Sequence, residues 1–206
     1  PIGRQPIKTG LRYRRDRGKA LAFVRDEVER GGQAYVVYPV VEGGQAKQVR
    51  SAKEAYKELK DGPFSGVRVG LIYGSMKAPE KSGVMEGFRS GEIDVLVSTT
   101  VIEVGVDVPN ATLMTLEGGE RFGLAQLHQL RGRIGRGKFP GYCTLFADLE
   151  KEETKKRLEA FVSTNDGFAL ADLDFELRGP GDLFGTRQHG LPPLRIANLV
   201  RDAEVV

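Results

Sequence analysis

Several residue types are scarce in this chain of 206 residues, and each scarcity excludes a class of site or protein. The single cysteine, Cys143, cannot form an internal disulfide, and its apolar neighbours predict a small core residue. His128 and His189 are far apart in the sequence, so no metal-ligand spacing occurs. No apolar run approaches the ~20 residues of a membrane span, and the polar, basic start is unlike a signal peptide. These absences favour a reducing, cytoplasmic setting and no membrane.

The chain also lacks the sequence motifs with which a protein binds a nucleotide on its own. It contains no Gly-x-x-x-x-Gly-Lys-[Ser/Thr], the loop whose backbone N–H groups cradle phosphates. It contains no Asp-Glu-x-His box after a strand that could hold Mg²⁺. The first residue is Pro1 rather than Met, which favours a piece of a longer protein.

The overall composition is that of an ordinary soluble α/β domain with an appendage, since 40% of residues are hydrophobic and 29% are charged. The net charge of +3 says less about partners than its distribution does. Seven basic residues crowd the first nineteen positions, which suits either a phosphate-facing edge or a solvated linker. They are Arg4, Lys8, Arg12, Arg14, Arg15, Arg17 and Lys19.

Strand and helix patterns alternate along most of the chain. Apolar, β-branched runs predict buried strands at 33–41, 67–73, 93–98, 112–116 and 142–147. Apolar residues at helical spacing predict helices at 17–30, 51–61, 79–88, 124–130, 150–162 and 168–177. We expect a parallel sheet with helices on both faces, followed by a helical hairpin and a long loop.

Three local features of this prediction concern the ends of elements. Asp16 is expected to cap the first helix, and Ser51 with Glu54 is expected to form a capping box at the start of the second. Residues 1–15 are expected to be an extended linker, and 42–50 a loop. Because ligands of parallel sheets lie beyond the carboxyl ends of the strands, 73–75 and 98–100 are candidate contacts.

Residues 97–137 are the stretch around which the rest is organised. They end in Gln129-Leu-Arg-Gly-Arg-Ile-Gly-Arg136, where arginines that follow a helix alternate with glycines. Glycine allows close approach and positive φ, and each guanidinium offers forked donors suited to phosphate oxygens. Two such forks could clamp a transferring phosphoryl group. Alone, these eight residues are also compatible with a solvated turn or an RNA-binding Arg/Gly tract.

The segment upstream decides between these readings. Thr99-Thr-Val-Ile-Glu-Val-Gly-Val-Asp107 at a strand end, together with the arginine segment, resembles motifs V and VI of superfamily-two helicases. A narrower group is similar over nearly the whole chain: the RecG-type fork-remodelling helicases and the bacterial transcription–repair coupling translocases. Leu177-Arg-Gly-Pro-Gly and Gly185-Thr-Arg-Gln-His-Gly in the tail resemble the RecG type, although the motor of a coupling translocase stays as an alternative.

The resemblance implies a division of the chain and a role for each motif. Residues 1–148 would be the second RecA-like motor domain, and 149–206 the translocation motif. Arg133 and Arg136 would reach the γ-phosphate of ATP, bound with Mg²⁺ mainly by a first motor domain that is missing here. Gly105, Asp107 and Gln129 would contact the nucleotide or orient those arginines.

The resemblance also implies contacts with branched or forked DNA and with other parts of the same protein. Thr99 and the Gly74-Ser75 turn would contact the DNA backbone. Arg157, Arg178, Arg187 and Gln188 would couple ATP-driven closure to DNA movement. The first RecA-like domain and a duplex-splitting wedge domain would be partners within a monomer.

Several simpler interpretations stay open from sequence. Thr99 could cap a strand end, and Arg157 could be one more solvated charge. Tyr73 stands where the family mostly has His, which leaves a hydrogen-bonding role there in doubt. As a whole, the chain could instead be a non-catalytic module that binds double-stranded DNA. A small nucleotide-dependent enzyme of another class would need a nucleophile, base or metal cluster that the sequence does not offer.

Overall fold

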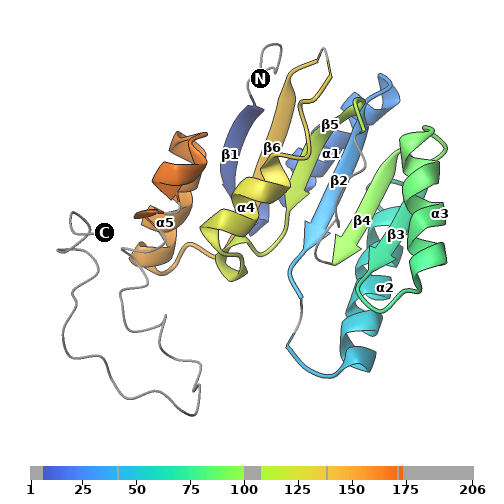
Figure 1. The fold of residues 1–206 in the computed structure, drawn as a ribbon, viewed down its shortest axis with the longest axis horizontal. Helices are drawn as coiled ribbons and strands as arrows, with labels where there is room; N and C mark the ends of the chain where they lie inside the picture. The colour runs from blue at the N-terminus through green and yellow to red at the C-terminus, as the bar shows by residue number, and fades with distance from the viewer. Residues whose placement is uncertain (1–6, 41, 100–107, 138, 171, 174–206) are drawn as a thin grey trace, which may run out of the picture.

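The six strands form one parallel sheet in a computed structural model that describes residues 7–40, 42–99, 108–137, 139–170 and 172–173. The strand order is β1-β6-β5-β2-β4-β3, and every pairing is parallel (Figure 1). The strands are β1 (Ile7–Tyr13), β2 (Gln33–Tyr38), β3 (Val69–Tyr73), β4 (Val95–Thr99), β5 (Ala111–Leu116) and β6 (Gly141–Ala147).

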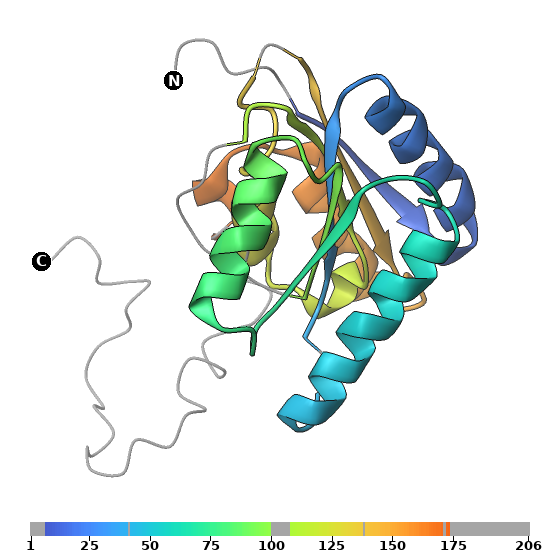
Figure 2. The ribbon, with the colours of Figure 1, turned by 90° about the vertical axis from the view of Figure 1, so that its right-hand side faces the viewer.

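Helices cover both faces of the sheet, as predicted. Helices α1 and α2 pack on one face, and α3, α4 and α5 pack on the other (Figure 2). The helices are α1 (Arg17–Glu29), α2 (Gln45–Asp61), α3 (Ala78–Arg89), α4 (Leu124–Arg131) and α5 (Glu152–Ser163), with single 3-10 turns η1 (Arg14–Asp16) and η2 (Gly119–Arg121). In the part of the chain that is described, no helix has both the length and the apolar character needed to cross a bilayer.

Strand β2 shows why both faces are apolar. Ala34 and Val36 face the cluster under α1 and α2, whereas Tyr35 and Val37 face the cluster under α3, α4 and α5. The Tyr35 ring lies 4.8 Å from the ring of Phe88 on α3. A strand buried on both sides needs a continuous apolar run, which is the pattern that made β2 and β4 predictable.

The prediction of an extended linker over residues 1–15 is wrong for residues 7–13, which form β1. The strand pairs with β6 in unbroken register from Ile7–Gly141 to Tyr13–Ala147. Ile7 and Leu11 pack against the core, while the basic residues Lys8 and Arg12 follow each of them directly. The density of charge conceals the strand, because an edge strand needs few apolar side chains and its partner is remote in sequence.

Of the two predicted helix caps, one is wrong and the other is correct in position only. Helix α2 begins at Gln45 after Gly44, so Ser51 and Glu54 lie inside the helix. Asp16 occupies the N-cap position of α1, but its side chain makes no capping hydrogen bond. The start of α3 at Pro79 is correct to one residue, since the proline stands in the first turn, where its missing N–H is harmless.

The part of the chain after β6 continues the fold on the α4 face. Leu158 and Phe161 of α5, together with Leu170, belong to the same core cluster as Leu124 and Leu127 of α4. The backbone is helical again at 167–170 and 172–173. The predicted long loop lies outside the described residues.

Candidate functional site

The arginine turn (residues 132–137) follows α4 directly. Arg133 is half-buried and Arg136 is exposed, with its Nε donating to the carbonyl oxygen of Gly132 at 3.2 Å. Ile134 between them has no exposed surface and anchors the turn in the core. The two arginines thereby lie on either side of a residue that is fixed in the core.

The glycines of this turn allow it to dock on the start of β5. Gly135 has φ of +70° and donates its N–H to the carbonyl oxygen of Ala111. A Cβ on Gly137 would lie 2.5 Å from the carbonyl oxygen of Pro109, so only glycine fits there without a shift of the backbone. The predicted positive φ is therefore confirmed at Gly135, whereas the close approach at Gly137 is to the backbone of the same chain and not to a ligand.

Other predicted nucleotide contacts lie partly beyond the described residues. Gly105 and Asp107 are outside them, although Val108 and Pro109 immediately downstream are described and Pro109 contacts Gly137. Gln129 is exposed on α4. Within the described ranges, no group of three or more His, Cys, Asp or Glu side chains could hold a metal ion.

The three predicted DNA contacts come together at the opposite end of the strands. Thr99 ends β4, and Gly74 and Ser75 form the exposed turn after β3. All three line one small cleft, which Tyr73 also lines. Lys81, which was not predicted, reaches this turn and donates from Nζ to the carbonyl oxygen of Gly74 at 2.8 Å.

Arg157 joins α5 to the segment that leads into α4. Its guanidinium donates to the carbonyl oxygens of Phe122 at 2.6 Å and Glu120 at 2.9 Å. The interpretation of Arg157 as one more solvated charge is therefore wrong. Arg178, Arg187 and Gln188 lie outside the described residues.

Comparison with known proteins identifies the family. The helicase conserved C-terminal domain matches residues 18–138, and the C-terminal part of domain 3 of the ATP-dependent DNA helicase RecG matches residues 164–206. This chain belongs to the helicase conserved C-terminal domain family. The second match agrees with the tail residues that indicated the RecG type.

RecG proteins of several bacteria are similar to this chain over nearly all of its length. The chain is 47% identical to the ATP-dependent DNA helicase RecG of Thermotoga maritima over 206 residues, and 45% identical to that of Bacillus subtilis over 202 residues. Those alignments cover 100% and 98% of the chain. The chain spans only 26% and 30% of these relatives.

Solved structures agree with this assignment. A structure of RecG bound to a three-way DNA junction matches with a TM-score of 0.78 and 45% identity, over 99% of this chain and 26% of that one. The C-terminal domain of the DEAD-box protein Dbp5 matches with a TM-score of 0.51 and 18% identity, over 78% of this chain and 83% of that one. At that identity the second match shows the RecA-like fold alone.

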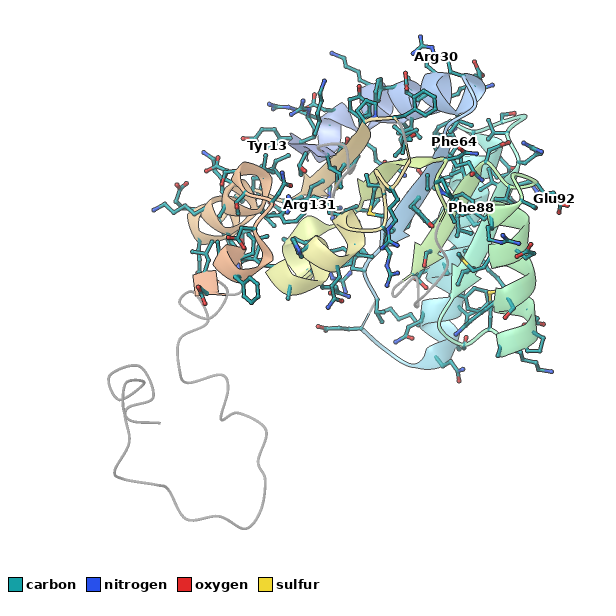
Figure 3. The ribbon with its side chains drawn as sticks, turned by 45° about the horizontal axis from the view of Figure 1, so that its top comes forward. Tyr13, Arg30, Phe64, Phe88, Glu92 and Arg131 are labelled. Atoms are coloured by element: carbon teal, nitrogen blue, oxygen red, sulfur yellow. The ribbon has the colours of Figure 1, made fainter. Side chains whose placement is uncertain are left out.

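A buried arginine of the helicase domain was missed from sequence. Arg131, the last residue of α4, is 2% exposed and lies between α4 and α5 (Figure 3). It donates to the carbonyl oxygens of Phe161 at 2.8 Å and Thr164 at 2.9 Å, and its guanidinium lies 4.3 Å from the centre of the Phe161 ring. The sequence did hold a signal for this burial. Arg131 follows Leu127 by four residues, and residues i and i+4 lie on the same face of a helix.

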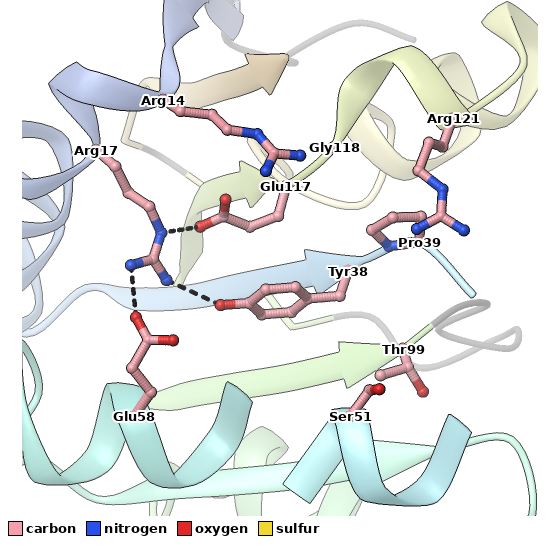
Figure 4. Close-up of a pocket in the computed structure, with 10 residues that line it drawn as sticks. All are labelled: Arg14, Arg17, Tyr38, Pro39, Ser51, Glu58, Thr99, Glu117, Gly118 and Arg121. Atoms are coloured by element: carbon pink, nitrogen blue, oxygen red, sulfur yellow. Dashed lines mark hydrogen bonds and ion pairs between the residues drawn. The ribbon is translucent and has the colours of Figure 1, made fainter. Parts of the chain in front are cut away.

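A charged cluster of the helicase domain was also missed, beyond the carboxyl ends of the strands (Figure 4). Arg17 donates to Glu117 at 2.6 Å, to Glu58 at 2.8 Å and to the hydroxyl of Tyr38 at 2.9 Å. Burial opposes the charge on Arg17, but the hydrogen bond and charge of Glu117 outweigh it and raise the arginine's pKa. Burial, reinforced by the negative charge of Glu117, raises the pKa of Tyr38 to about 12.

This charged cluster forms the floor of an open cleft of about 330 Å³. Arg14, Arg121, Ser51 and Thr99 also line it. Its residues come from five separate parts of the sequence, and sequence periodicity gives no means of placing them together.

Proposed function

We propose that this chain is the second RecA-like motor domain of an ATP-dependent DNA helicase that remodels stalled replication forks and branched DNA junctions. One observation carries the proposal. Two arginines stand on a glycine turn docked against the start of β5, in a chain without a phosphate-cradling loop of its own. Such arginines can act on a nucleotide held by another domain.

The proposed nucleotide site lies between two domains. ATP would be bound mainly by a first RecA-like domain, which would also supply the ligands of Mg²⁺. The arginine turn fits this division, because it offers forked donors for phosphate oxygens but no carboxylate cluster among the described residues. Domain closure would bring Arg133 and Arg136 to the γ-phosphate, where charge develops in the transition state. Gly105, Asp107 and Gln129 would contact the nucleotide or orient the arginines.

The proposed DNA contacts lie at the carboxyl edge of the sheet. Thr99, Gly74 and Ser75 would bind backbone phosphates through hydroxyl and N–H groups, with Lys81 nearby as a positive charge. Contacts of this kind set position and do not read sequence. They suit a motor that moves along DNA of any sequence. RecG, whose solved structure holds a three-way junction, is the relative that supports branched DNA as the substrate.

We further propose that residues 149–206 transmit domain closure to the DNA. Arg157 supports this role, since it connects α5 to the carbonyls that precede α4 and hence to the helix that carries the arginine turn. Arg178, Arg187 and Gln188 would complete the coupling. Residues 1–148 would form the motor domain proper, and the complete protein would act as a monomer with a wedge domain that splits the duplex.

The first prediction tests Arg136 in the complete helicase that contains this chain. Arg136→Lys keeps the charge but removes the forked donors, so DNA-stimulated ATP hydrolysis should fall by ~10³-fold. Nucleotide binding should change little, because the lost contact forms mainly in the transition state. Steady-state ATPase assays and titration with a fluorescent ATP analogue measure the two effects.

A matched control is Arg89→Lys on α3, where the arginine is exposed and paired with Glu86 across one helix turn. It should leave both measurements unchanged. An Arg136→Lys enzyme that hydrolyses ATP within a few-fold of the wild-type rate would contradict the assignment of Arg136 to the γ-phosphate.

A further inference from the structure

Two clefts follow one another along the carboxyl edge of the sheet. The first is lined by the turn after β3 and by Thr99 of β4, and the second by residues that follow β2, β5 and β1. Both clefts share Thr99 and Pro39. Because the sheet order is β1-β6-β5-β2-β4-β3, these residues form one continuous path across the edge of the sheet.

The two ends of this path differ in charge. The proposed DNA contacts at the β3–β4 end are neutral apart from Lys81, whereas the other end carries three arginines. Arg17 is already committed to Glu117, Glu58 and Tyr38 on the floor of the cleft. Arg14 and Arg121 stand on its rim.

The rim arginines have donors to spare. The Arg14 side chain is 68% exposed, and its ion pair with Glu120 is long, at 3.5 Å. Arg121 is exposed and donates from Nη2 to the carbonyl oxygen of Val40 at 2.8 Å. A guanidinium offers five N–H donors, so each rim arginine can bind an anion while keeping the contact it makes now.

The carboxylates of the cleft only partly offset its arginines. Glu117 and Glu58 are both paired with Arg17, whose single positive charge offsets one of their two negative charges, and Arg14 and Arg121 leave the lining with a net charge of +1. Hydroxyl groups of Ser51 and Thr99 add neutral donors to the lining. Guanidinium and hydroxyl donors suit phosphate oxygens, the contact that carries no sequence information.

We propose that Arg14 and Arg121 form a second phosphate site, which binds the DNA backbone beyond the contacts of Thr99, Gly74 and Ser75. The proposal rests on the function proposed above, since it extends the same path of DNA. It assigns separate roles to two arginines near the start of the chain. Arg14 binds the DNA backbone, while Arg17 holds Glu117, Glu58 and Tyr38 together beneath the cleft.

The test is a double replacement, Arg14→Gln with Arg121→Gln, in the complete helicase. Affinity for a forked DNA is measured by fluorescence anisotropy between about 50 and 200 mM KCl. The slope of log affinity against log salt is negative, and each lost phosphate contact should reduce its magnitude by ~1. The double variant should therefore give a slope that is shallower by about 1 to 2. Arg89→Gln on α3 is the control and should leave the slope unchanged.

A second variant should change affinity in the opposite direction. Glu120→Gln removes the carboxylate that pairs with Arg14 but keeps an oxygen to accept the N–H of Asp148. Affinity for DNA should then rise by about 2- to 3-fold at low salt, because Arg14 gains freedom and a negative charge is lost. An unchanged affinity in Glu120→Gln would count against a DNA contact at Arg14.

Three results would overturn the proposal. One is an unchanged salt slope in the double variant. Another is weaker binding of a fluorescent ATP analogue with the DNA slope intact, which would make the cleft a nucleotide site. The third is a lower melting temperature with equal loss of affinity at every salt concentration, which would indicate a structural role.

Thr99→Ala distinguishes failure of this inference from failure of the proposed function. If Thr99→Ala weakens DNA binding but the double arginine variant does not, only the second phosphate site is refuted. If neither variant affects DNA binding, the proposed DNA path at the carboxyl edge fails as a whole.

Discussion

At the scale of single residues, Arg131 is the clearest case of a charge that is structural. It belongs to the same arginine-rich segment as Arg133 and Arg136, yet only 2% of its surface is exposed. Its guanidinium donates hydrogen bonds to two carbonyl oxygens at the end of α5. A cation at a helix C-terminus also interacts favourably with the helix dipole. Arg131 is therefore structural, whereas Arg133 and Arg136 in the same segment are proposed to act on a nucleotide.

The second prediction concerns stability. Arg131→Met preserves much of the apolar stem but leaves the carbonyl oxygens of Phe161 and Thr164 without this donor. The free energy of unfolding should fall by about 2–4 kcal/mol, the range for losing charged hydrogen bonds in a buried setting. Urea denaturation of the purified chain, followed by circular dichroism, measures it.

Arg136→Met is the matched control, since the same substitution at an exposed position should cost less than about 1 kcal/mol. Equal stability of the two variants would show that the cap on α5 contributes little.

At the scale of elements, the position of the arginine turn depends on how closely two segments approach. Gly137 lies against the backbone that precedes β5, and Ile134 is packed in the core. The turn is consequently located by the sheet and not by α4 alone. Small displacements of such groups are expensive in catalysis, since a shift of about 1 Å can cost ~10² in rate.

The third prediction follows from this packing. Gly137→Ala places a Cβ 2.5 Å from the carbonyl oxygen of Pro109, which forces the two segments apart. The free energy of unfolding should fall by about 1–3 kcal/mol, and ATP hydrolysis by the complete helicase should fall at least ~10-fold. Thermal melts and ATPase assays of the variant measure these effects.

Gly83→Ala provides the contrast, because nothing lies within 4 Å of the Cβ it would add on α3. That variant should be more stable by about 0.5–1 kcal/mol, as alanine favours a helix over glycine. Wild-type ATPase activity in Gly137→Ala would refute the dependence of the arginine turn on this close approach.

The sequence predicts elements well where the signal is local. Doubly buried strands such as β2 and β4 are continuous apolar runs, and Pro79 marks the start of α3 to within one residue. Prediction from sequence fails where an element forms because of a partner that is distant in the sequence. β1 is a strand because β6 pairs with it, and the start of α2 at Gln45 is not marked by any capping side chain.

The candidate site divides in the same way. The location of Thr99, Gly74 and Ser75 is predictable, because the carboxyl ends of parallel strands lie at the same edge of a sheet. The structure places all three in one cleft. The cluster of Arg17, Glu117 and Glu58 joins three distant segments through side chains alone. Residue spacing in the sequence cannot predict such a cluster. Only the folded structure shows that it lies on the same edge of the sheet.

At the scale of the whole molecule, the two sets of proposed contacts lie at opposite ends of the strands. The arginine turn docks on the start of β5, and the DNA path follows the carboxyl edge. A sheet buried on both faces is a stiff connection between them. Movement of the domain on a nucleotide would therefore displace the DNA edge as part of one body.

The fourth prediction is that the purified chain does not hydrolyse ATP, with or without forked DNA. It has arginines that could stabilise a transition state but no loop to cradle the phosphates. Phosphate-release assays should give the same rate as buffer alone. DNA-stimulated hydrolysis that Arg136→Ala abolishes would contradict the assignment as one half of a motor.

The pairing of β1 with β6 has a consequence for how the domain forms. Of the six strands that the structure describes, the ribosome makes β1 before the others, and β6, to which β1 bonds, comes last. Until then β1 has no partner, and closing so long a loop is entropically costly, which predicts slow completion of the sheet. Exposed strand edges invite aggregation, and lysine and arginine side chains are the usual protection. The charges of Lys8 and Arg12 would thus guard the nascent chain during the interval before its last strand arrives.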